Sequence, residues 1–448
     1  MTKSFFGTDG IRGAVGVEPI TPQTIVHLGW ALGTVIKKHY GNGSVLVGKD
    51  TRVSGYLLES AMEAGLSSAG MDVVMLGPLP TPAIAYLTQT ARAHAGVVIS
   101  ASHNHYSDNG IKFFSPLGTK ISDEIQDEIE ALMRTKMDVV DSEQLGKAFR
   151  MDDAVGRYVE FCKGTIPRRM DLKGMRVALD CANGAAYQSA PAVFHELGAD
   201  LEVINNTPDG FNINNQCGST HIEGLQKLVL EKNCDVGIAF DGDADRVLMV
   251  DAHGNLVDGD QLLFVIANSQ QQQGRLKGGV VGTLMSNFGM EKALSDRGIP
   301  FVRAKVGDRY VMQELQQREW VLGGESSGHI ICLDKTTTGD GLVSALQVLT
   351  QVQFMGKALH ELAAEMPMYP QKMINVRLPN GAVASQVVAL PSVQNAIKEV
   401  ERELADSGRV LLRPSGTEPV IRVMVEGENK QQVVGLCEEL SQQVSNCL

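Results

Sequence analysis

Short apolar runs rich in β-branched residues alternate with amphipathic helical patterns along most of the chain. This alternation constrains the fold more than any other feature of the sequence, because strand–helix–strand repeats predict mostly parallel sheets covered by helices. The predicted strands lie at 44–50, 71–77, 95–100, 174–180, 201–205, 234–240, 278–284, 301–307 and 320–324. The predicted helices lie at 21–38, 55–69, 121–134, at a segment ending near 197, and at 222–233, 260–270, 290–298 and 308–317.

The last part of the chain has a different pattern, with longer strands and two flanking helices. Strands are predicted at 373–378, 409–414 and 420–427, and helices at 391–405 and from Lys430 onward, which is typical of a small α+β unit. A chain of 448 residues is too long for one typical core. We therefore expect three α/β domains, at 1–155, 156–256 and 257–368, and an α+β domain at 369–448.

The net charge, the cysteine pattern and the lack of long apolar runs indicate which partners and which cell compartment to expect. The chain carries 40 Lys and Arg against 52 Asp and Glu, a net charge of −12, so we expect no nucleic-acid partner and only local clusters for binding phosphate. The seven Cys form no CxxC pair, which suits a reducing compartment. No apolar run is long enough for a bilayer and the N-terminus has no signal-peptide core, so we expect a cytoplasmic protein without a membrane partner.

The motif ISASHN directly follows a predicted strand and contains Ser102, His103 and Asn104. Ligands of open α/β sheets collect at the carboxyl ends of strands, so a Ser beside a His at such a place is a candidate nucleophile. The alternative is that these polar residues only form a turn.

The motif FDGDADR follows the predicted strand 234–240 and places Asp241, Asp243 and Asp245 at alternate positions. Three carboxylates on one loop can turn toward one hard cation, which prefers oxygen ligands. An EF-hand is excluded, because its Gly and Glu positions are occupied by Arg246 and Ala252. A solvated acidic turn remains the alternative, but three close like charges are unfavourable without a cation.

The loop RPSGTEP carries groups suited to phosphate. RPSGTEP offers hydroxyls, loop amides and an arginine fork, which together can bind a phosphate dianion; it is not a P-loop, and a plain turn is the alternative. Its candidate residues are Arg413, Ser415, Gly416, Thr417 and, on the next strand, Arg422.

GGESSGH permits two interpretations. Gly324 to Gly328 matches the GxSxG elbow of hydrolases, with Ser326 as nucleophile, but that motif requires a following helix, and the apolar HIICLD predicts a strand. In the other interpretation Glu325 and Ser327 bind sugar hydroxyls and His329 meets a phosphate.

Seven motifs in order resemble the α-D-phosphohexomutases over nearly the whole chain, from Phe6 to Arg422. They are FGTDGIRG with Arg12, KDTR at 49–52, SASHN, NGIKFF with Lys112, DGDADR, GGESSGH and RPSGTEP. Within the family, a Ser at 326 is similar to the enzymes of glucosamine phosphates, whereas the phosphomannomutase/phosphoglucomutase relatives usually carry Met there.

The resemblance implies three related α/β domains and a smaller phosphate-binding domain, arranged in a heart shape around a central cleft. It implies a phosphoserine at Ser102, and a Mg²⁺ ion held by that phosphate with Asp241, Asp243 and Asp245. By similarity, Arg12, Lys112 and His103 line the transfer site, Glu325 and Ser327 grip the sugar, and Arg413, Ser415, Gly416 and Thr417 hold the non-reacting phosphate.

The implied activity interconverts glucosamine 6-phosphate and glucosamine 1-phosphate through phosphoserine and a glucosamine 1,6-bisphosphate intermediate. A small phosphosugar is then the partner, and a homodimer is allowed. Two alternatives stay open: a phosphomannomutase/phosphoglucomutase of the same family, and a haloacid-dehalogenase-like phosphatase with Asp241 as nucleophile. The second conflicts with its DxDx[TV] pattern, because residue 245 is Asp.

One position departs from the family's usual SHNP. His105 follows Asn104 where Pro is usual, so the loop lacks a residue that fixes φ and restricts its predecessor. We expect His105 to be an exposed loop residue, with a catalytic base as the alternative, and the missing Pro leaves the rigidity of the loop open.

Overall fold

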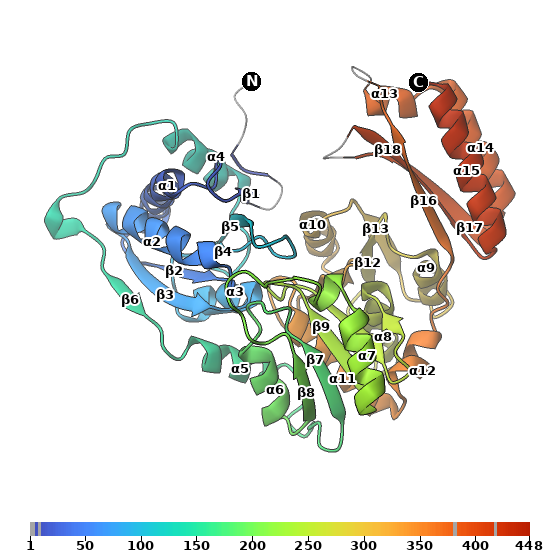
Figure 1. Ribbon diagram of the computed structural model, residues 1–448, viewed down its shortest axis with the longest axis horizontal. Coiled ribbons are helices and arrows are strands. Elements are labelled where there is room, and N and C mark those ends of the chain that lie inside the picture. The colour runs from blue at the N-terminus through green and yellow to red at the C-terminus, as the bar shows by residue number, and fades with distance from the viewer. Residues whose placement is uncertain (1–4, 8–9, 380–382, 416–418) are drawn as a thin grey trace.

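The computed structural model describes residues 5–7, 10–379, 383–415 and 419–448, and shows four domains, each built on its own sheet. Figure 1 shows the domains following one another in an arc, from the N-terminal domain in blue to the C-terminal domain in red. None of the helices in these described ranges is both long enough and apolar enough to cross a bilayer.

The first domain has a six-stranded sheet in the order β1-β5-β4-β2-β3-β6. Helices α1 and α2 pack together against one face, while apolar residues of α3 join the core on the other. Thr21 caps α1 with its side chain and Pro22 begins the helix, as the sequence predicts. The elements are β1 (Ile11–Ala14), α1 (Pro22–Tyr40), β2 (Ser44–Lys49), α2 (Val53–Ser68), β3 (Asp72–Pro78), α3 (Thr81–Thr90), β4 (Ala95–Ile99), β5 (Asp108–Phe114), α4 (Asp123–Leu132) and β6 (Ala148–Arg150).

The second and third domains repeat part of this arrangement. Their sheets run β11-β10-β9-β7-β8 and β15-β14-β12-β13. The runs β10-β9-β7-β8 and β15-β14-β12-β13 match β5-β4-β2-β3 of the first sheet strand for strand, and β11 is an additional edge strand. The second domain contains α5 (Ala154–Gly164), β7 (Arg176–Asp180), α6 (Ser189–Glu196), β8 (Asp200–Ile204), α7 (Glu223–Lys232), β9 (Val236–Phe240), β10 (Val247–Asp251) and β11 (Leu256–Val257). The third contains α8 (Gly259–Gln272), β12 (Val280–Thr283), α9 (Phe288–Ser295), β13 (Phe301–Ala304), α10 (Asp308–Arg318), β14 (Leu322–Gly324), β15 (Ile330–Cys332), α11 (Gly341–Met355) and α12 (Leu359–Ala364).

Each of these three sheets also contains antiparallel pairs, so the sheets are mixed rather than parallel throughout. Strands β5, β10 and β15 each run antiparallel to the preceding strand. The connections before them, residues 100–107, 241–246 and 325–329, are too short for a crossover, since a parallel return needs a dozen or more residues. The result is three equivalent hairpin loops, and each of them carries one of the sequence motifs.

The fourth domain has an entirely antiparallel sheet in the order β16-β18-β17. It has its own apolar core, whereas one large core cluster runs through the first three domains. Figure 1 shows this domain at one corner, next to the third. Its elements are β16 (Gln371–Arg377), α13 (Ala384–Val388), α14 (Pro391–Leu404), β17 (Gly408–Pro414), β18 (Val420–Gly427) and α15 (Lys430–Asn446).

Candidate active site

Ser102 lies in the hairpin loop between β4 and β5 and is 2% exposed. Its hydroxyl donates a hydrogen bond to Asp241 Oδ2 at 2.6 Å, across 139 residues of chain and from one domain to the next. His103 Nδ1 lies 3.3 Å from the same hydroxyl oxygen. The SASHN and DGDADR motifs therefore meet at the hydroxyl of Ser102.

The backbone at Ser102 is left-handed, with φ of 50°. The chain of the second domain approaches it closely, because a Cβ on Gly242 would lie 2.6 Å from the Ser102 carbonyl oxygen. Only glycine fits at the second position of DGDADR for this reason.

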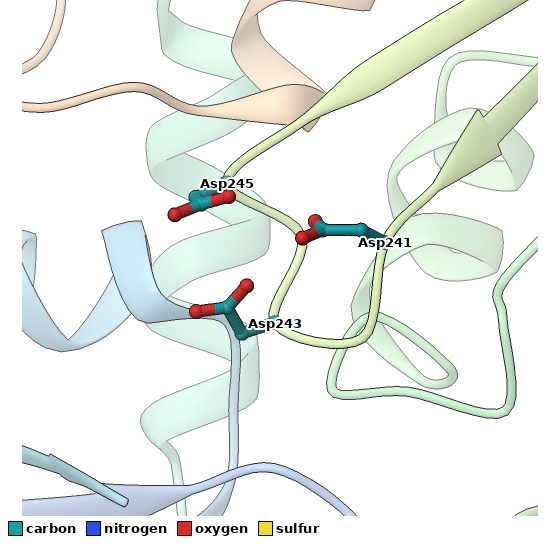
Figure 2. Close-up of side chains that lie close together, drawn as sticks. All are labelled: Asp241, Asp243 and Asp245. Atoms are coloured by element: carbon teal, nitrogen blue, oxygen red, sulfur yellow. The ribbon is translucent and has the colours of Figure 1, made fainter. Parts of the chain in front are cut away.

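Asp241, Asp243 and Asp245 form a buried cluster in the loop between β9 and β10, and one oxygen of each lies within 4.8 Å of the others. Figure 2 shows the three carboxylates turning their oxygens toward the space between them. Burial, together with repulsion from Asp245 and Asp243, raises the pKa of Asp241 well above its usual value. Buried Oδ1 atoms of Asp243 and Asp245 have no hydrogen-bond partner in the described chain. These orphaned oxygens and the three carboxylates fit a hard divalent cation.

Two groups of the first domain also reach the carboxylate cluster. Lys112 Nζ, on β5, lies 3.1 Å from Asp243 Oδ2 and 3.6 Å from Asp245 Oδ2. Thr81, at the start of α3, donates its hydroxyl to Asp243 Oδ2 at 2.7 Å. The strand pairing of β5 therefore places the lysine of NGIK beside the DGDADR loop.

His103 is held in its neutral form. Burial and the positive charges of Arg246 and Arg12 lower the pKa of His103 to about 4. Arg12 itself is exposed and lies on β1, which pairs with β5.

The GGESSGH motif forms the hairpin loop between β14 and β15. Glu325 Oε1 accepts a hydrogen bond from the Gly307 N–H at 3.0 Å, and His329 Nδ1 lies 3.7 Å from Asp245 Oδ1. Burial alone would favour neutral His329, but attraction to Asp245 and Asp308 raises the pKa of His329 to about 9. The chain continues as strand β15, so the nucleophile elbow at Ser326 is excluded.

A cavity of about 730 Å³ opens between these three hairpin loops. It brings together six of the residues that the sequence singles out, which are Arg12, Ser102, Lys112, Asp245, Glu325 and His329. Asp241, Asp243 and His103 lie directly behind Ser102 and Lys112, through the contacts given above. Ser327 belongs to the same loop but is not among the residues that line the cavity.

Among the described phosphate-binding candidates of the fourth domain, Arg413, Ser415 and Arg422 do not line this cavity. Arg413 on β17 and Arg422 on β18 face each other as direct partners in the antiparallel ladder. Burial and the neighbouring charge of Arg422 lower the pKa of Arg413. Gly416 and Thr417 lie outside the described residues, and Ser415 donates its N–H to the Val420 carbonyl at 2.9 Å.

The cavity also contains residues that sequence reasoning missed as site residues, notably Glu18, Arg246, Gly307 and Asp308. Arg246 ends the quoted DGDADR motif, so its position there was an available signal. Gly307 and Asp308 stand where a strand passes into helix α10, a junction at which ligands commonly bind. Glu18 lies in a loop before α1 with no such pattern.

Four family models match the chain in succession. They describe phosphoglucomutase/phosphomannomutase alpha/beta/alpha domain I at residues 3–139, domain II at 157–254, domain III at 258–369 and the C-terminal domain at 373–443. The order and spacing of the matches agree with the four sheets.

Curated relatives match from end to end. The phosphoglucosamine mutase of Alcanivorax borkumensis is 58% identical over 448 residues and all of both chains, and that of Hahella chejuensis is 57% identical over 444 residues and 98% of both. The phosphoglucosamine mutase of Legionella pneumophila (strain Paris) is 56% identical over 447 residues, covering 98% of this chain and 97% of its own.

Solved structures share the fold at lower identity. A phosphoglucomutase/phosphomannomutase family protein from Burkholderia thailandensis superposes with a TM-score of 0.81 at 21% identity, covering 99% of this chain and 97% of its own. An Aspergillus fumigatus N-acetylphosphoglucosamine mutase, solved with GlcNAc-6P and magnesium, gives 0.69 at 17% identity, covering 99% and 96%. The shared fold, the four domain matches and the full-length relatives show that this chain belongs to the phosphoglucomutase/phosphomannomutase family, the α-D-phosphohexomutases.

Proposed function

We propose that the protein is a phosphoglucosamine mutase, which interconverts glucosamine 6-phosphate and glucosamine 1-phosphate. The observation that carries the proposal is the 2.6 Å hydrogen bond between the Ser102 hydroxyl and a buried carboxylate of the Asp cluster, at a cavity large enough for a phosphosugar. The substrate follows from the full-length relatives named above, which are 56–58% identical.

Ser102 Oγ carries the transferred phosphoryl group. The O1 hydroxyl of glucosamine 6-phosphate attacks phosphorus, the P–Oγ bond breaks, and the O1 proton leaves to a base, giving the 1,6-bisphosphate. The bisphosphate then turns, and the 6-phosphoryl group passes back to Ser102 Oγ, leaving glucosamine 1-phosphate. Lys112, Arg12 and His103 are the candidates for the proton transfer, and the low pKa of His103 leaves it unprotonated near neutral pH.

Asp241, Asp243 and Asp245 would hold Mg²⁺, for which their buried, like-charged oxygens are suited. When bound there, the ion neutralises charge on the transferring phosphoryl group. Lys112 supplies a second positive charge beside the same carboxylates. Phosphoryl transfer depends on such positioning and neutralisation more than on covalent chemistry by the protein.

The sugar and the second phosphate have their own candidate contacts. Glu325 and Ser327 would bind sugar hydroxyls, and a protonated His329 would meet a phosphate, consistent with its pKa of about 9. In the fourth domain Arg413 and Arg422 are direct partners in the ladder and their positive charges repel, an arrangement that an anion stabilises. With Ser415, Gly416 and Thr417 they would hold the phosphate that is not reacting.

A coupled assay with glucosamine, glucose and mannose 6-phosphates side by side tests the proposal. We expect the highest kcat/KM for glucosamine 6-phosphate and a phosphate on Ser102 that resists hydroxylamine. A preference for mannose or glucose 6-phosphate would instead indicate a phosphomannomutase/phosphoglucomutase. A hydroxylamine-labile phosphate on Asp241 would indicate a phosphatase of the haloacid-dehalogenase type.

The domain limits near 155, 256 and 368 stay predictions, as do a homodimer and a cytoplasmic location. Limited proteolysis and light scattering of the purified protein would test the first two.

A further inference from the structure

Two buried side chains donate hydrogen bonds to the backbone carbonyl oxygens of Ser102 and Asn104, in the serine loop. Arg52 Nη2 donates to the carbonyls of Ser102 and Asn104 at 3.1 and 2.6 Å. Asn214 Nδ2 donates to the same two carbonyls at 2.8 and 3.2 Å. One side chain comes from the first domain and the other from the second, so the loop is held at the seam between them.

Arg52 is fully buried and is itself held in place by hydrogen bonds within the first domain. Its guanidinium pairs with Asp50, which also accepts the Arg52 N–H at 3.0 Å and the hydroxyl of Ser100. The Ser100 hydroxyl in turn accepts the Ser102 N–H at 2.9 Å. The KDTR motif therefore fixes both the amide and the carbonyl of Ser102, a role that the reaction scheme above does not assign to it.

Asn214 reaches the serine loop because the second domain packs closely against the first at this point. A Cβ on Gly242 would lie 2.7 Å from Asn214 Nδ2, so glycine leaves the space that the amide occupies. The seam continues next to it, where the Thr51 hydroxyl donates to the Asn183 carbonyl and the Val53 N–H donates to the Gly210 carbonyl at 2.9 Å.

These hydrogen bonds can hold Ser102 in a backbone conformation that it would not readily adopt by itself. A non-glycine residue with φ of 50° is disfavoured and persists only where its surroundings over-determine it. The loop also lacks a proline at position 105, which would have restricted Asn104.

We propose that Asn214 and Arg52 are positioning residues that clamp the loop of Ser102 in its left-handed conformation and align Oγ with the Asp cluster. The proposal rests on the proposed function, since alignment matters only if Ser102 carries the transferred group. A displacement of about 1 Å at a reacting centre can cost about a hundredfold in rate. The clamp therefore acts on kcat rather than on substrate binding.

The sharpest variant is Asn214→Asp. Asp keeps the side-chain volume and tolerates the φ of 56° at this position, but it replaces the N–H donor by an oxygen that faces two carbonyls. Asn212→Asp is the matched control, because Asn212 is in the same loop and donates to the Thr207 carbonyl at 3.1 Å instead of to the serine loop. Asn214→Ala is a second variant, which removes the donor without adding a repelling oxygen.

We expect kcat to fall about tenfold to a hundredfold in Asn214→Asp, and less in Asn214→Ala, with KM changed by less than about threefold. Amide hydrogen exchange of residues 101–109 should be faster in both variants, and phosphorylation of Ser102 by added bisphosphate slower. Asn212→Asp should match the wild type in all three readouts. The melting temperature should fall more in Asn214→Asp, whose carboxylate is buried against two carbonyls, than in Asn212→Asp, whose side chain is only partly buried.

Two results would overturn the clamp. One is a kcat within twofold of wild type in Asn214→Asp, and the other is unchanged exchange of residues 101–109. The exchange measurement does not depend on turnover. A wild-type protein without mutase activity, whose variants still exchange faster at 101–109, would therefore reject the proposed function and support the clamp.

Discussion

The chemistry of this site depends on a few buried polar atoms that the sequence places far apart. The spacing of Asp241, Asp243 and Asp245 predicts a cation site, and they do form one cluster. The sequence could not show that the Ser102 hydroxyl donates to Asp241, because that contact joins two domains. Motif order indicates which residues take part, whereas distances between them follow only from how the domains pack.

Ser102→Ala removes the atom that we propose to carry the phosphoryl group. Turnover should fall to the background of the assay, because the variant lacks the hydroxyl that donates to Asp241, while phosphosugar binding should persist. Intact mass should show the phosphorylated fraction in the wild type and its loss in the variant. Substantial activity, or phosphate retained elsewhere, would contradict the assignment.

Asp243→Asn removes one of the three carboxylates that we propose to hold Mg²⁺ and weakens the hydrogen-bonded contacts of Asp243 with Lys112 and Thr81. Affinity for Mg²⁺, measured by titration of chelator-treated protein, should fall by about tenfold or more, and activity should require correspondingly more metal. Asp152→Asn, at an exposed carboxylate, is the control. Full activity of the wild type in excess chelator would count against the metal site.

At the scale of elements, the apolar pattern predicts most of the amphipathic helices and the parallel strands of all three α/β sheets except β6, a three-residue edge strand whose residues are all exposed. It misses α11, because Gly341–Met355 is buried on nearly all sides and shows no polar face. It misses α3 for the same reason, since most of Thr81–Thr90 is buried. Strands β5 and β10 are missed because each directly follows a polar motif, which the sequence pattern assigns to a loop.

Asp260, in the first turn of α8, gives a prediction at this scale. Burial and the nearby Asp258 raise the pKa of Asp260 to about 7, and its Oδ2 accepts the Asn287 N–H at 2.7 Å. A raised carboxyl pKa costs no stability below about pH 4, where folded and unfolded states are both protonated, and costs most above about pH 7, where both are ionised.

Asp260→Asn keeps an oxygen for Asn287 and removes the charge. Its melting temperature relative to the wild type should therefore rise as the pH increases from 5 to 8, by several degrees in total. A difference that stays constant across that range would mean that Asp260 does not titrate there.

At the scale of the molecule, one apolar cluster runs through the first three domains, whereas the fourth domain has a core of its own. The joint between the third and fourth domains is polar: Arg409 donates to the carbonyls of Leu284 and Ser286 and pairs with the buried Glu426 at 2.7 Å. A domain attached by polar contacts of this kind can move as a unit more readily than domains that share a core. This arrangement suits the role that we propose for the fourth domain, which would bind a phosphate and release it while the intermediate turns.

Arg413 tests whether that fourth domain belongs to the active site. Its fork can donate two charge-assisted hydrogen bonds to the phosphate that is not reacting. That phosphate is remote from the bond being made, so its binding energy serves to hold the sugar in line for transfer. Arg413→Ala should therefore lose about 2 kcal/mol or more of transition-state stabilisation, the low end for truncating one partner of a buried charge pair.

The fold should be nearly unaffected, because Arg413 is only half-buried and its ladder partner is another arginine, whose repulsion the substitution relieves. Arg413→Lys should recover only part of the loss, since a point charge lacks the fork. Arg402→Ala, an exposed arginine on α14 of the same domain, is the control and should match the wild type in kcat/KM. Steady-state kinetics with melting curves on all three variants make the comparison. If folded Arg413→Ala keeps the wild-type kcat/KM, the fourth domain does not bind the substrate phosphate, and the reaction takes place within the first three domains alone.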